Sequence, residues 1–229
     1  MDVPVAALSH GRSGKAAQAV ETAARWRRRK DARPQEILDA ALSVFAEKGF
    51  AAARLEEIAA RAGVSKGTIY LYFESKEAVF KALVEENLAS RIGGFAELVR
   101  SHRGPAAQLL AELLRQIGAF LSTSPFVVLP KIVIAESGNF PDLARAYREQ
   151  VAERGFSLVG EVIRRGIAQG EFRDIAVDHA VRLAMAPMLL IAVWRTTFAR
   201  FDVKPYDYAG LIEAHIATLL AGLMKEEKP

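Results

Sequence analysis

The sequence predicts an all-α protein, and three observations support this. Apolar residues recur every three or four positions from Pro34 almost to the C-terminus, which is the period of an amphipathic helix. No stretch shows the apolar and polar alternation of a half-buried strand. Glycine and proline divide the pattern into segments of helical length. We expect a basic arm over residues 1–30, a small three-helix head over 31–77 and a larger helical body over 78–229.

The first predicted helix starts near Pro34, which suits a first helical turn, and stops at Gly49, which suits the position after a helix. Its apolar stripe consists of Ile37, Leu38, Ala41, Leu42 and Phe45. A second helix over about 55–62 presents Leu55, Ile58, Ala59 and Ala62, and Gly63 ends it. A third, short helix follows near 66–72, and it completes the head.

The body is predicted as six further helices, near 76–101, 106–122, 126–137, 142–168, 175–201 and 206–225. The breaks between them are Gly104-Pro105, Ser124-Pro125, Gly138 with Pro141, Gly170 and Lys204-Pro205. Pro187 falls inside the predicted helix 175–201, where it removes a backbone hydrogen bond and should kink the helix.

Composition excludes several classes of function. The absence of cysteine rules out disulfides, thiolate catalysis and cysteine-ligated zinc. The four histidines have no metal-ligand spacing, so we expect neither a metal site nor a cofactor. No apolar core of a signal peptide follows Met1, and the longest apolar run, 183–194, is too short to span a bilayer. We therefore expect a cytoplasmic protein without a membrane segment.

Positive charge is concentrated at the N-terminus. The formal net charge is +4, and residues 1–33 alone contain eight basic and three acidic residues, a net charge of +5. A basic arm ahead of a near-neutral folded part suggests a polyanionic partner, while a solvated, disordered tail explains the same charge.

The stretch "AGVSKGTIYLYFESK", residues 62–76, carries the functional signal. It follows the second helix through a short turn into the third, which is the layout of a helix-turn-helix. On a helical wheel, Ile69 and Phe73 point inward and should pack against Phe45 and Ile58. The opposite face carries Gly67, Thr68, Tyr70 and Leu71, with Lys66 at the amino end and Tyr72 on the flank. This mixture suits the DNA major groove better than a solvated surface. Packing roles for Tyr70 and Tyr72 and a loop role for Gly67 are the alternative.

Each side chain on the outward face has a plausible partner in DNA. Lys66 and Thr68 can bind base edges or phosphates, and Leu71 can contact a thymine methyl or a sugar. The absence of a side chain at Gly67 lets the backbone approach closely. The tyrosine hydroxyls can donate to phosphate oxygens, and Lys76 at the start of the next helix can add a further phosphate contact.

The segment "ILDAALSVFAEKGFAAARLEEIAARAGVSKGTIYLYFESKEAVFKALVE" resembles the DNA-binding head of the TetR, or tetracycline-repressor, family of transcriptional regulators over about residues 34–85. The resemblance implies a homodimer with a nine-helix fold, a third helix in the major groove, and a C-terminal body that binds an effector. It also implies DNA contacts at the matching positions, which are Lys66, Gly67, Thr68, Tyr70, Tyr72 and Lys76. Residues 133–151 and the last two helices resemble the C-terminal domain of one TetR subgroup less specifically.

Arg54 departs from the family pattern. The second helix of the family usually opens with serine or threonine, which caps the helix and touches phosphate. Arginine at this position loses the cap, at a typical cost of ~1 kcal/mol. Either Arg54 supplies a phosphate contact instead, or it is simply solvated.

An apolar cavity for the effector is expected among the body helices. The residues predicted to line it are Phe120, Phe126, Phe140, Tyr147, Phe156, Met185, Met188 and Trp194, with Glu136, Asn139 and Arg195 as nearby polar candidates. For any one of these aromatic residues and methionines, ordinary core packing is the competing explanation. The sequence supports an apolar or amphipathic ligand and does not identify it.

The last predicted helix has a wide apolar stripe formed by Tyr208, Leu211, Ile212, His215, Ile216, Leu219, Leu220 and Leu223. The resemblance implies a four-helix dimer bundle built from helices near 175–201 and 206–225 of each subunit. Packing within the subunit must use part of the same stripe. We favour dimerisation because a symmetric operator needs two heads.

The sequence thus predicts a homodimeric repressor that reads a near-palindromic double-stranded DNA operator and is released by a small apolar or amphipathic ligand. A helical interaction protein without DNA binding is the alternative, and it leaves the outward face of 66–72 unexplained. An enzyme is rejected, because "HGRSGK" (10–15) lacks the spacing and the preceding strand of a phosphate loop, and no nucleophile elbow or HExxH motif occurs.

Overall fold

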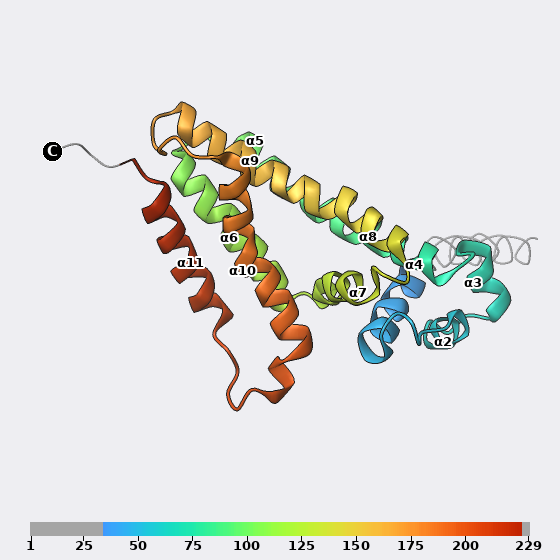
Figure 1. Cartoon of the computed structure of the whole chain (residues 1–229). Helices are drawn as coiled ribbons and strands as arrows, with labels where there is room; N and C mark the ends of the chain where they lie inside the picture. Colours follow the sequence, from blue (N-terminus) through green and yellow to red (C-terminus); the bar gives the residue numbers. More distant parts are fainter. Residues whose placement is uncertain (1–33, 226–229) are drawn as a thin grey trace, which may run out of the picture.

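The computed structural model describes residues 34–225, and over this range the all-α prediction is confirmed (Figure 1). The described residues form nine α-helices when each helix that contains a π-turn is counted as one. β-bridge pairing is limited, in this part of the chain, to one isolated antiparallel bridge between Phe172 and Met224. The predicted basic arm over 1–30 lies outside the described residues.

The head consists of a helix described from residue 34 to residue 48, α2 (Leu55–Arg61) and α3 (Lys66–Tyr72). Gly49 and Gly63 end the first two helices with φ of 78° and 66°, a conformation that favours glycine after a helix. The predicted inward stripes are buried in one apolar cluster, except that Ala62 is half-buried and packs against it. Arg61 of α2 donates to both carboxylate oxygens of Glu47, which ties α2 to the first helix.

A single long helix connects the head to the body. It comprises α4 (Lys76–Leu83), the π-turn η1 (Val84–Leu88) and α5 (Ala89–Ser101), in agreement with the prediction of one helix over 76–101. A similar interruption divides the predicted helix 142–168 into α8 (Pro141–Tyr147), the π-turn η3 (Arg148–Ala152) and α9 (Glu153–Ala168). The two π-turns lie against each other, and π-turns are frequent at functional sites.

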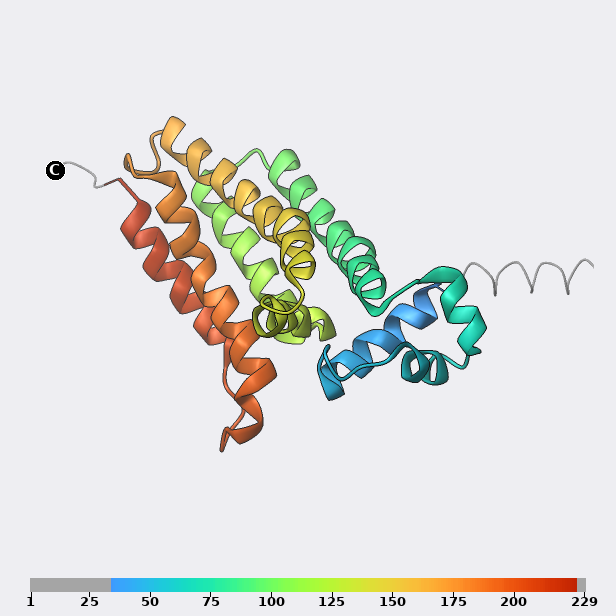
Figure 2. The ribbon, with the colours of Figure 1, turned by 45° about the vertical axis from the view of Figure 1, so that its right-hand side comes forward.

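The other body helices agree with the prediction to within a few residues. They are α6 (Ala106–Thr123), the 3-10 turn η2 (Pro125–Val127), α7 (Val128–Glu136), α10 (Val177–Thr197), the 3-10 turn η4 (Ala199–Phe201) and α11 (Tyr208–Leu223). Figures 1 and 2 show α6, α9, α10 and α11 side by side in the body, with α7 between them and the head. Pro187 lies inside α10, and the helix continues past it.

Within the described residues, α10 is the single unbroken helix that is long and apolar enough to cross a membrane. It has 21 residues, so it extends beyond the apolar run seen in the sequence. The core helix of a soluble protein has the same properties, and α10 packs against α6 and α9. Its buried residues include Ala184, Met188 and Ile191. These features are therefore weak evidence for a membrane segment.

The apolar core has two parts. The head-side cluster contains the head residues, residues of α4 and η1, and four residues of α7 and α8. The residues from outside the head are Val79, Phe80, Leu83, Val84, Leu88, Val128, Leu129, Ile132 and Leu143. The second cluster holds α6, α9, α10 and α11 together. The first cluster therefore crosses the proposed boundary, and α8 packs against α4. The division of the chain at residues 77 and 78 stays a prediction.

The apolar stripe of α11 packs mainly within its own subunit. Ile212, Ile216 and Leu223 are buried in the body core, and Tyr208, Leu211, Leu219 and Leu220 pack against the same cluster. The Nε2 of His215 lies 2.9 Å from the carbonyl oxygen of Ala184. Part of the stripe therefore serves the subunit core, as expected, and dimerisation through α10 and α11 stays a prediction. The exposed large apolar residues of this region belong instead to α10 and to the segment after it, and they are Leu183, Leu189, Leu190, Trp194, Phe198, Phe201, Val203 and Tyr206.

Candidate nucleic-acid interface and ligand cavity

Ser65 determines how α3 begins. Its Oγ accepts a hydrogen bond from the backbone N–H of Thr68 at 3.1 Å, which caps the helix, and it lies 2.8 Å from the Thr68 hydroxyl. This serine therefore orients the Thr68 side chain as well as the helix. Ser65 was not among the residues predicted from the sequence, although a serine before a helical segment is a capping signal.

The two predicted faces of α3 are found in the structure. Ile69 is fully buried and Phe73 is 9% exposed, and both belong to the head-side cluster. Tyr70 is 46% exposed and Leu71 is 83% exposed, so two adjacent large side chains of the outward face lie in solvent. Gly67 is also exposed, whereas Thr68 and Tyr72 are half-buried, and Tyr72 packs against the head core.

Lys66 is paired with an acidic residue of the neighbouring helix. Its Nζ lies 2.8 Å from Glu56 Oε1 of α2 and 6.0 Å from the centre of the Tyr70 ring. The hydrogen bond to Glu56 raises the pKa of the Lys66 ammonium and lowers the pKa of the Glu56 carboxyl. Lys66 is thus positively charged and held over the outward face of α3, while Glu56 sets a negative charge close to it.

Lys76 occupies a different place from the one predicted. Its ammonium donates to the carbonyl oxygens of Phe50 at 2.9 Å and Ala51 at 2.7 Å, with a longer contact of 3.4 Å to Ala53. The side chain is therefore turned into the head, where it donates hydrogen bonds to carbonyl oxygens of the turn after the first helix. This is a correction to its role as a side-chain phosphate contact. Only the backbone start of α4, capped by Ser75, remains available for such a contact.

Arg54 stands at the N-cap of α2 and makes no side-chain capping hydrogen bond, as its residue type predicts. The side chain is exposed. Both explanations for it, a phosphate contact and simple solvation, remain predictions.

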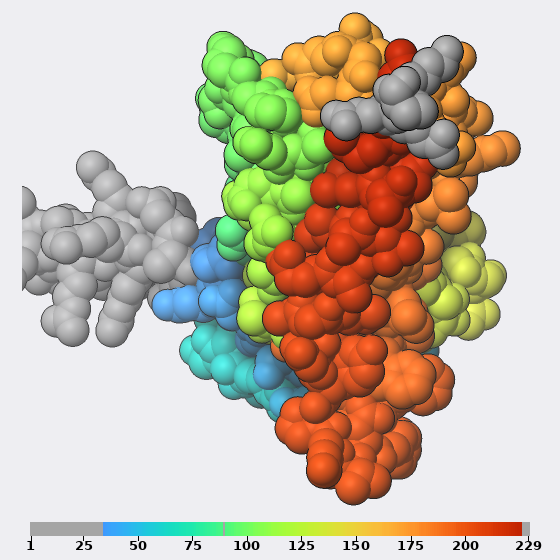
Figure 3. Space-filling model, turned by 90° about the vertical axis from the view of Figure 1, so that its left-hand side faces the viewer, coloured from blue at the N-terminus to red at the C-terminus, as the bar shows by residue number. Residues whose placement is uncertain are grey.

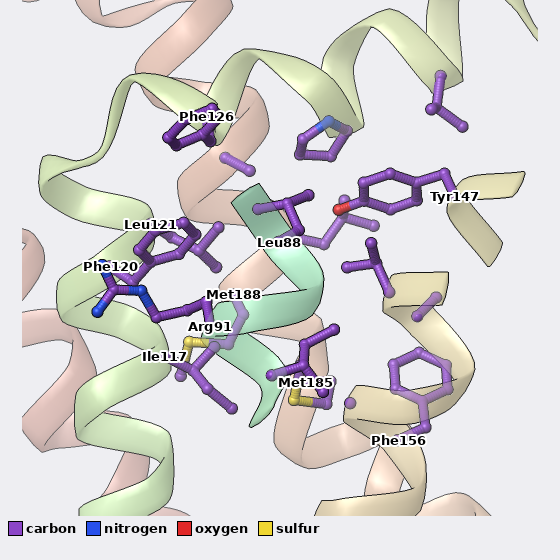
Figure 4. A pocket seen from close by; sticks show the side chains of 18 of the residues that line it. Leu88, Arg91, Ile117, Phe120, Leu121, Phe126, Tyr147, Phe156, Met185 and Met188 are labelled. Atoms are coloured by element: carbon purple, nitrogen blue, oxygen red, sulfur yellow. The ribbon is translucent and has the colours of Figure 1, made fainter. Parts of the chain in front are cut away.

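A cavity of about 480 Å³ lies in the body between α5, α6, α7, η3, α9 and α10 (Figure 4). Six of the predicted aromatic and methionine residues line it, and they are Phe120, Phe126, Tyr147, Phe156, Met185 and Met188. Its size is within the range of small-molecule sites, which is roughly 300–1,000 Å³. The wall is mostly apolar, and it includes Leu88 at the end of η1 as well as Val151 and Ala152 of η3. Both π-turns therefore border the cavity.

Three residues of the predicted ligand set lie elsewhere. Glu136 Oε1 accepts a hydrogen bond from the backbone N–H of Ala51 at 3.2 Å, and the Phe140 ring packs on the Phe50 ring with centres 5.0 Å apart. These two residues join the body to the head. Trp194 donates from Nε1 to Asp202 Oδ2 at 2.9 Å and borders a separate hollow.

The two other polar candidates are also outside the cavity wall. Asn139 donates its backbone N–H to the Glu136 carbonyl oxygen at 3.0 Å, in the turn between α7 and α8. Arg195 donates to the carbonyl oxygens of Leu121 and Ser124 at 3.0 and 2.7 Å, so it supplies hydrogen-bond donors to carbonyl groups at the C-terminal end of α6.

Sequence reasoning missed the charged groups of the cavity, Arg91 of α5 and Arg182 of α10. The Arg91 guanidinium lies 5.1 Å from the centre of the Phe120 ring and has no acidic partner in the part of the chain that the structure describes. Arg182 pairs with Asp178 at 3.4 Å. No sequence signal separates these residues from other exposed arginines, because both lie on ordinary amphipathic helices.

A smaller hollow of about 190 Å³ lies between α10 and α11. Leu190, Trp194, Tyr206 and Tyr208 are among the residues that border it. The Tyr208 hydroxyl is buried without a hydrogen-bond partner in the described structure. This hollow adjoins the exposed apolar residues of α10, so it belongs to the surface proposed below for dimerisation.

Two family models match the chain. The model of bacterial regulatory proteins of the tetR family matches residues 37–83, and the model of the tetracyclin repressor-like C-terminal domain matches residues 101–202. The chain is 28% identical over 211 residues to the HTH-type transcriptional regulator YfiR of Bacillus subtilis, covering 87% of this chain and 96% of that protein. It is 26% identical over 197 residues to the fatty acid metabolism regulator protein of the same organism, covering 85% and 98%.

A similar solved structure is the transcriptional regulator FadR from Bacillus subtilis in complex with stearoyl-CoA. It matches with a TM-score of 0.71 and 25% identity, over 82% of this chain and 98% of that chain. A helix-turn-helix head on a helical body of this kind defines the class of DNA-binding transcription regulators with a ligand-binding domain. Within that class, the chain belongs to the TetR family of bacterial regulatory proteins.

Proposed function

We propose that the protein is a homodimeric repressor that reads a near-palindromic operator through α3 and releases it when an apolar or amphipathic ligand enters the body cavity. The observation that carries the proposal is the outward face of α3, where Leu71 and Tyr70 are exposed beside a charged Lys66. A large exposed leucine on a folded head has no packing role, and a thymine methyl or a sugar would cover it.

The DNA contacts follow from the placement of each group. Lys66 and the tyrosine hydroxyls of Tyr70 and Tyr72 would bind phosphates, and Thr68, held by Ser65, would face a base edge or a phosphate. Because Gly67 has no side chain, the backbone of α3 would approach the DNA closely at this position. Arg54 would add a phosphate contact at the start of α2. The basic arm over 25–33 would follow the phosphates or enter a minor groove.

Dimerisation is proposed through α10 and α11. Figure 3 shows α11 running across one face of the molecule beside the end of α10. Several exposed side chains of α11 are small, among them Ala214, Ala217 and Ala221, which lets a second helix approach closely. Leu189 and Leu190 of α10 are about half exposed and would be covered by the partner. Two heads would then meet successive major grooves ~34–36 Å apart.

The ligand is proposed to be an amphipathic molecule whose apolar part fills the cavity and whose polar end lies at its edge. The apolar wall supports the first part of this proposal, and exposed Arg91, which has no acidic partner in the described structure, supports the second. One relative is named for fatty acid metabolism, and one similar structure holds stearoyl-CoA. By chemistry, a fatty acid or its thioester fits both parts.

The coupling between ligand and head would run through α7, α8 and the long helix α4–η1–α5. The cavity is lined by Val133 of α7, Tyr147 of α8 and Leu88 of η1, and the same helices pack on the head. A ligand that favours one arrangement of these helices would favour one spacing of the two heads, by as much as its affinity differs between the two arrangements.

The test is binding of the purified protein to the DNA upstream of its own gene, titrated against salt, with a random duplex as control. Tight, selective binding that weakens steeply with salt is the expected result. Stearic acid and stearoyl-CoA are then added to look for release. Equal, weak binding to both duplexes by a folded dimer would favour the alternative, a helical interaction protein. A repressor of this kind would act in the cytoplasm and need no membrane.

A further inference from the structure

The hydroxyl of Tyr147 stands apart from the rest of the cavity wall. Among the described residues that line the cavity, Tyr147 is the one with an uncharged polar side chain, and the remainder are apolar except for Arg91 and Arg182. Figure 4 shows its oxygen directed away from α8 toward the other lining side chains. No hydrogen bond to this hydroxyl occurs within the described part of the chain. The group is therefore available to whatever occupies the cavity.

The surroundings keep this hydroxyl protonated and fixed in place. Burial raises the pKa of the Tyr147 phenol well above its ordinary value, so the group is a donor throughout the physiological range. The ring packs against the head-side cluster, which restricts its movement. Buried hydroxyls are nearly always hydrogen-bonded, and tyrosine is placed where one end is apolar and the other has a partner. An unpaired donor aimed into an apolar space therefore indicates a partner on the ligand.

We infer that Tyr147 is a specificity-determining residue, and that the ligand carries a neutral oxygen acceptor, such as a ketone, an ester or a hydroxyl, within its apolar part. The inference rests on the proposed function, because it takes the cavity as the effector site. A plain hydrocarbon chain would cover the hydroxyl without satisfying it. A site built to bind an oxygen discriminates against the analogue that lacks it.

The acceptor is neutral because a charge at this depth has no cation to pair with. Arg91 and Tyr147 lie on opposite sides of the cavity in Figure 4, and both arginines of the wall are exposed. A carboxylate or phosphate is far cheaper to place at an exposed arginine than beside a buried phenol. The anionic end and the neutral oxygen of the ligand are therefore two separate groups with two separate partners.

The test compares two ligand types on two proteins. The probes are stearic acid and a set of its monoketone derivatives, in which the ketone occupies successive positions along the chain. Their dissociation constants are measured for the wild-type protein and for Tyr147→Phe, which keeps the ring and removes the hydroxyl. Tyr208→Phe is the control for loss of a tyrosine hydroxyl outside this cavity, and light scattering checks that this variant keeps the oligomeric state of the wild-type protein. Thermal unfolding of each variant confirms the fold.

The expected result depends on the position of the ketone. At one or a few positions the derivative binds the wild-type protein about tenfold more tightly than it binds Tyr147→Phe. Stearic acid binds both proteins equally or prefers Tyr147→Phe, and Tyr208→Phe behaves as wild type. The loss of affinity caused by Tyr147→Phe is compared between the ketone and stearic acid. The difference between the two losses isolates the hydrogen bond from any general effect of the substitution on the cavity.

Three outcomes would overturn the inference. The first is that Tyr147→Phe weakens the binding of stearic acid and of all its derivatives to the same extent. The second is that no derivative binds the two proteins with different affinity. The third is that the wild-type protein binds none of the probes. Operator binding is measured on the same samples. Ligand binding that shows the Tyr147 coupling but leaves the operator complex intact would support this inference and contradict the release mechanism proposed above.

Discussion

The Lys76 ammonium lies 4.8 Å from the centre of the Phe50 ring and donates a hydrogen bond to the Phe50 carbonyl oxygen at 2.9 Å. The same ammonium lies 5.5 Å from the ring of Phe140, which comes from the body. Lys76 is therefore held where the turn after the first helix, the start of α4 and the α7–α8 connection meet. A change in the body that moves Phe140 would disturb this arrangement directly.

Replacing Lys76 with methionine tests whether the ammonium stabilises this junction. Lys76→Met keeps the aliphatic part of the side chain and removes the ammonium that donates to the carbonyl oxygens of Phe50, Ala51 and Ala53. The expected effect is a loss of about 1–3 kcal/mol in the free energy of unfolding, measured by urea denaturation. Lys81→Met in the same helix is the control, because Lys81 is exposed and makes no hydrogen bond or ion pair in the described residues. Equal stability of the two variants would contradict this role.

The charge pair between Lys66 and Glu56 leads to opposite predictions for its two members. Lys66→Ala should weaken binding to specific and random DNA alike and reduce the salt slope by about one unit per subunit, because one phosphate contact is lost. Glu56→Gln should strengthen binding to both, because it removes a negative charge that competes with phosphate for Lys66. Fluorescence anisotropy at several salt concentrations measures both slopes. If Lys66→Ala binds DNA with the same affinity as the wild-type protein, α3 does not contact DNA as proposed.

Helical periodicity was sufficient to predict most of the fold and the two faces of α3. Ile69 and Phe73 are buried because apolar residues four apart share one side of a helix, which holds regardless of the rest of the chain. Periodicity gives no information about which helices meet. The contact between Glu136 and Ala51 joins residues 85 positions apart, so Glu136 and Phe140 were placed in the cavity when they belong to the head–body junction.

The remaining errors have a related physical cause. An apolar stripe is the same in sequence whether it packs inside a subunit or between two subunits, so periodicity could not divide the α11 residues between these two roles. Arg91 was missed because a cation at a cavity edge is indistinguishable in sequence from a cation in solvent. Lys76 was assigned to phosphate because its sequence position, at the start of a helix, does not indicate that its side chain turns inward.

Filling the cavity should abolish ligand response without unfolding the body. Gly155 lines the cavity, and a Cβ atom built at this position meets no other atom within 4 Å. Gly155→Leu should therefore place a side chain in open space and also favour the helix by roughly 1 kcal/mol relative to glycine. We expect normal operator binding and loss of fatty-acid binding, measured by displacement of a fluorescent fatty acid. Gly94→Leu is the control, since Gly94 is equally unobstructed but does not line the cavity.

The dimer surface and the DNA surface can be separated with two leucines. Leu190 of α10 is 52% exposed and Leu71 of α3 is 83% exposed, so aspartate at either position should leave the subunit folded. Leu190→Asp should give a monomer by light scattering and lose selective operator binding as a consequence. Leu71→Asp should remain a dimer and lose operator binding alone. A dimeric Leu190→Asp protein would move the interface to another surface of the body.

Arg91 provides the last prediction, which concerns the charged end of the ligand. Its guanidinium lies at the cavity edge on the Phe120 ring and has no acidic partner among the described residues, whereas Arg182 is already paired with Asp178.

Lauric acid and dodecanol differ at the head group, and the acid is ionised at neutral pH. Arg91→Gln should weaken lauric acid by about two- to fivefold, as expected for an exposed ion pair, and leave dodecanol unchanged. Arg182→Gln should change the affinity for either ligand less than Arg91→Gln changes the affinity for lauric acid. The difference for Arg91 should shrink in high salt, because an exposed charge is screened. Equal losses for acid and alcohol would show that Arg91 acts by packing on Phe120 and not by its charge.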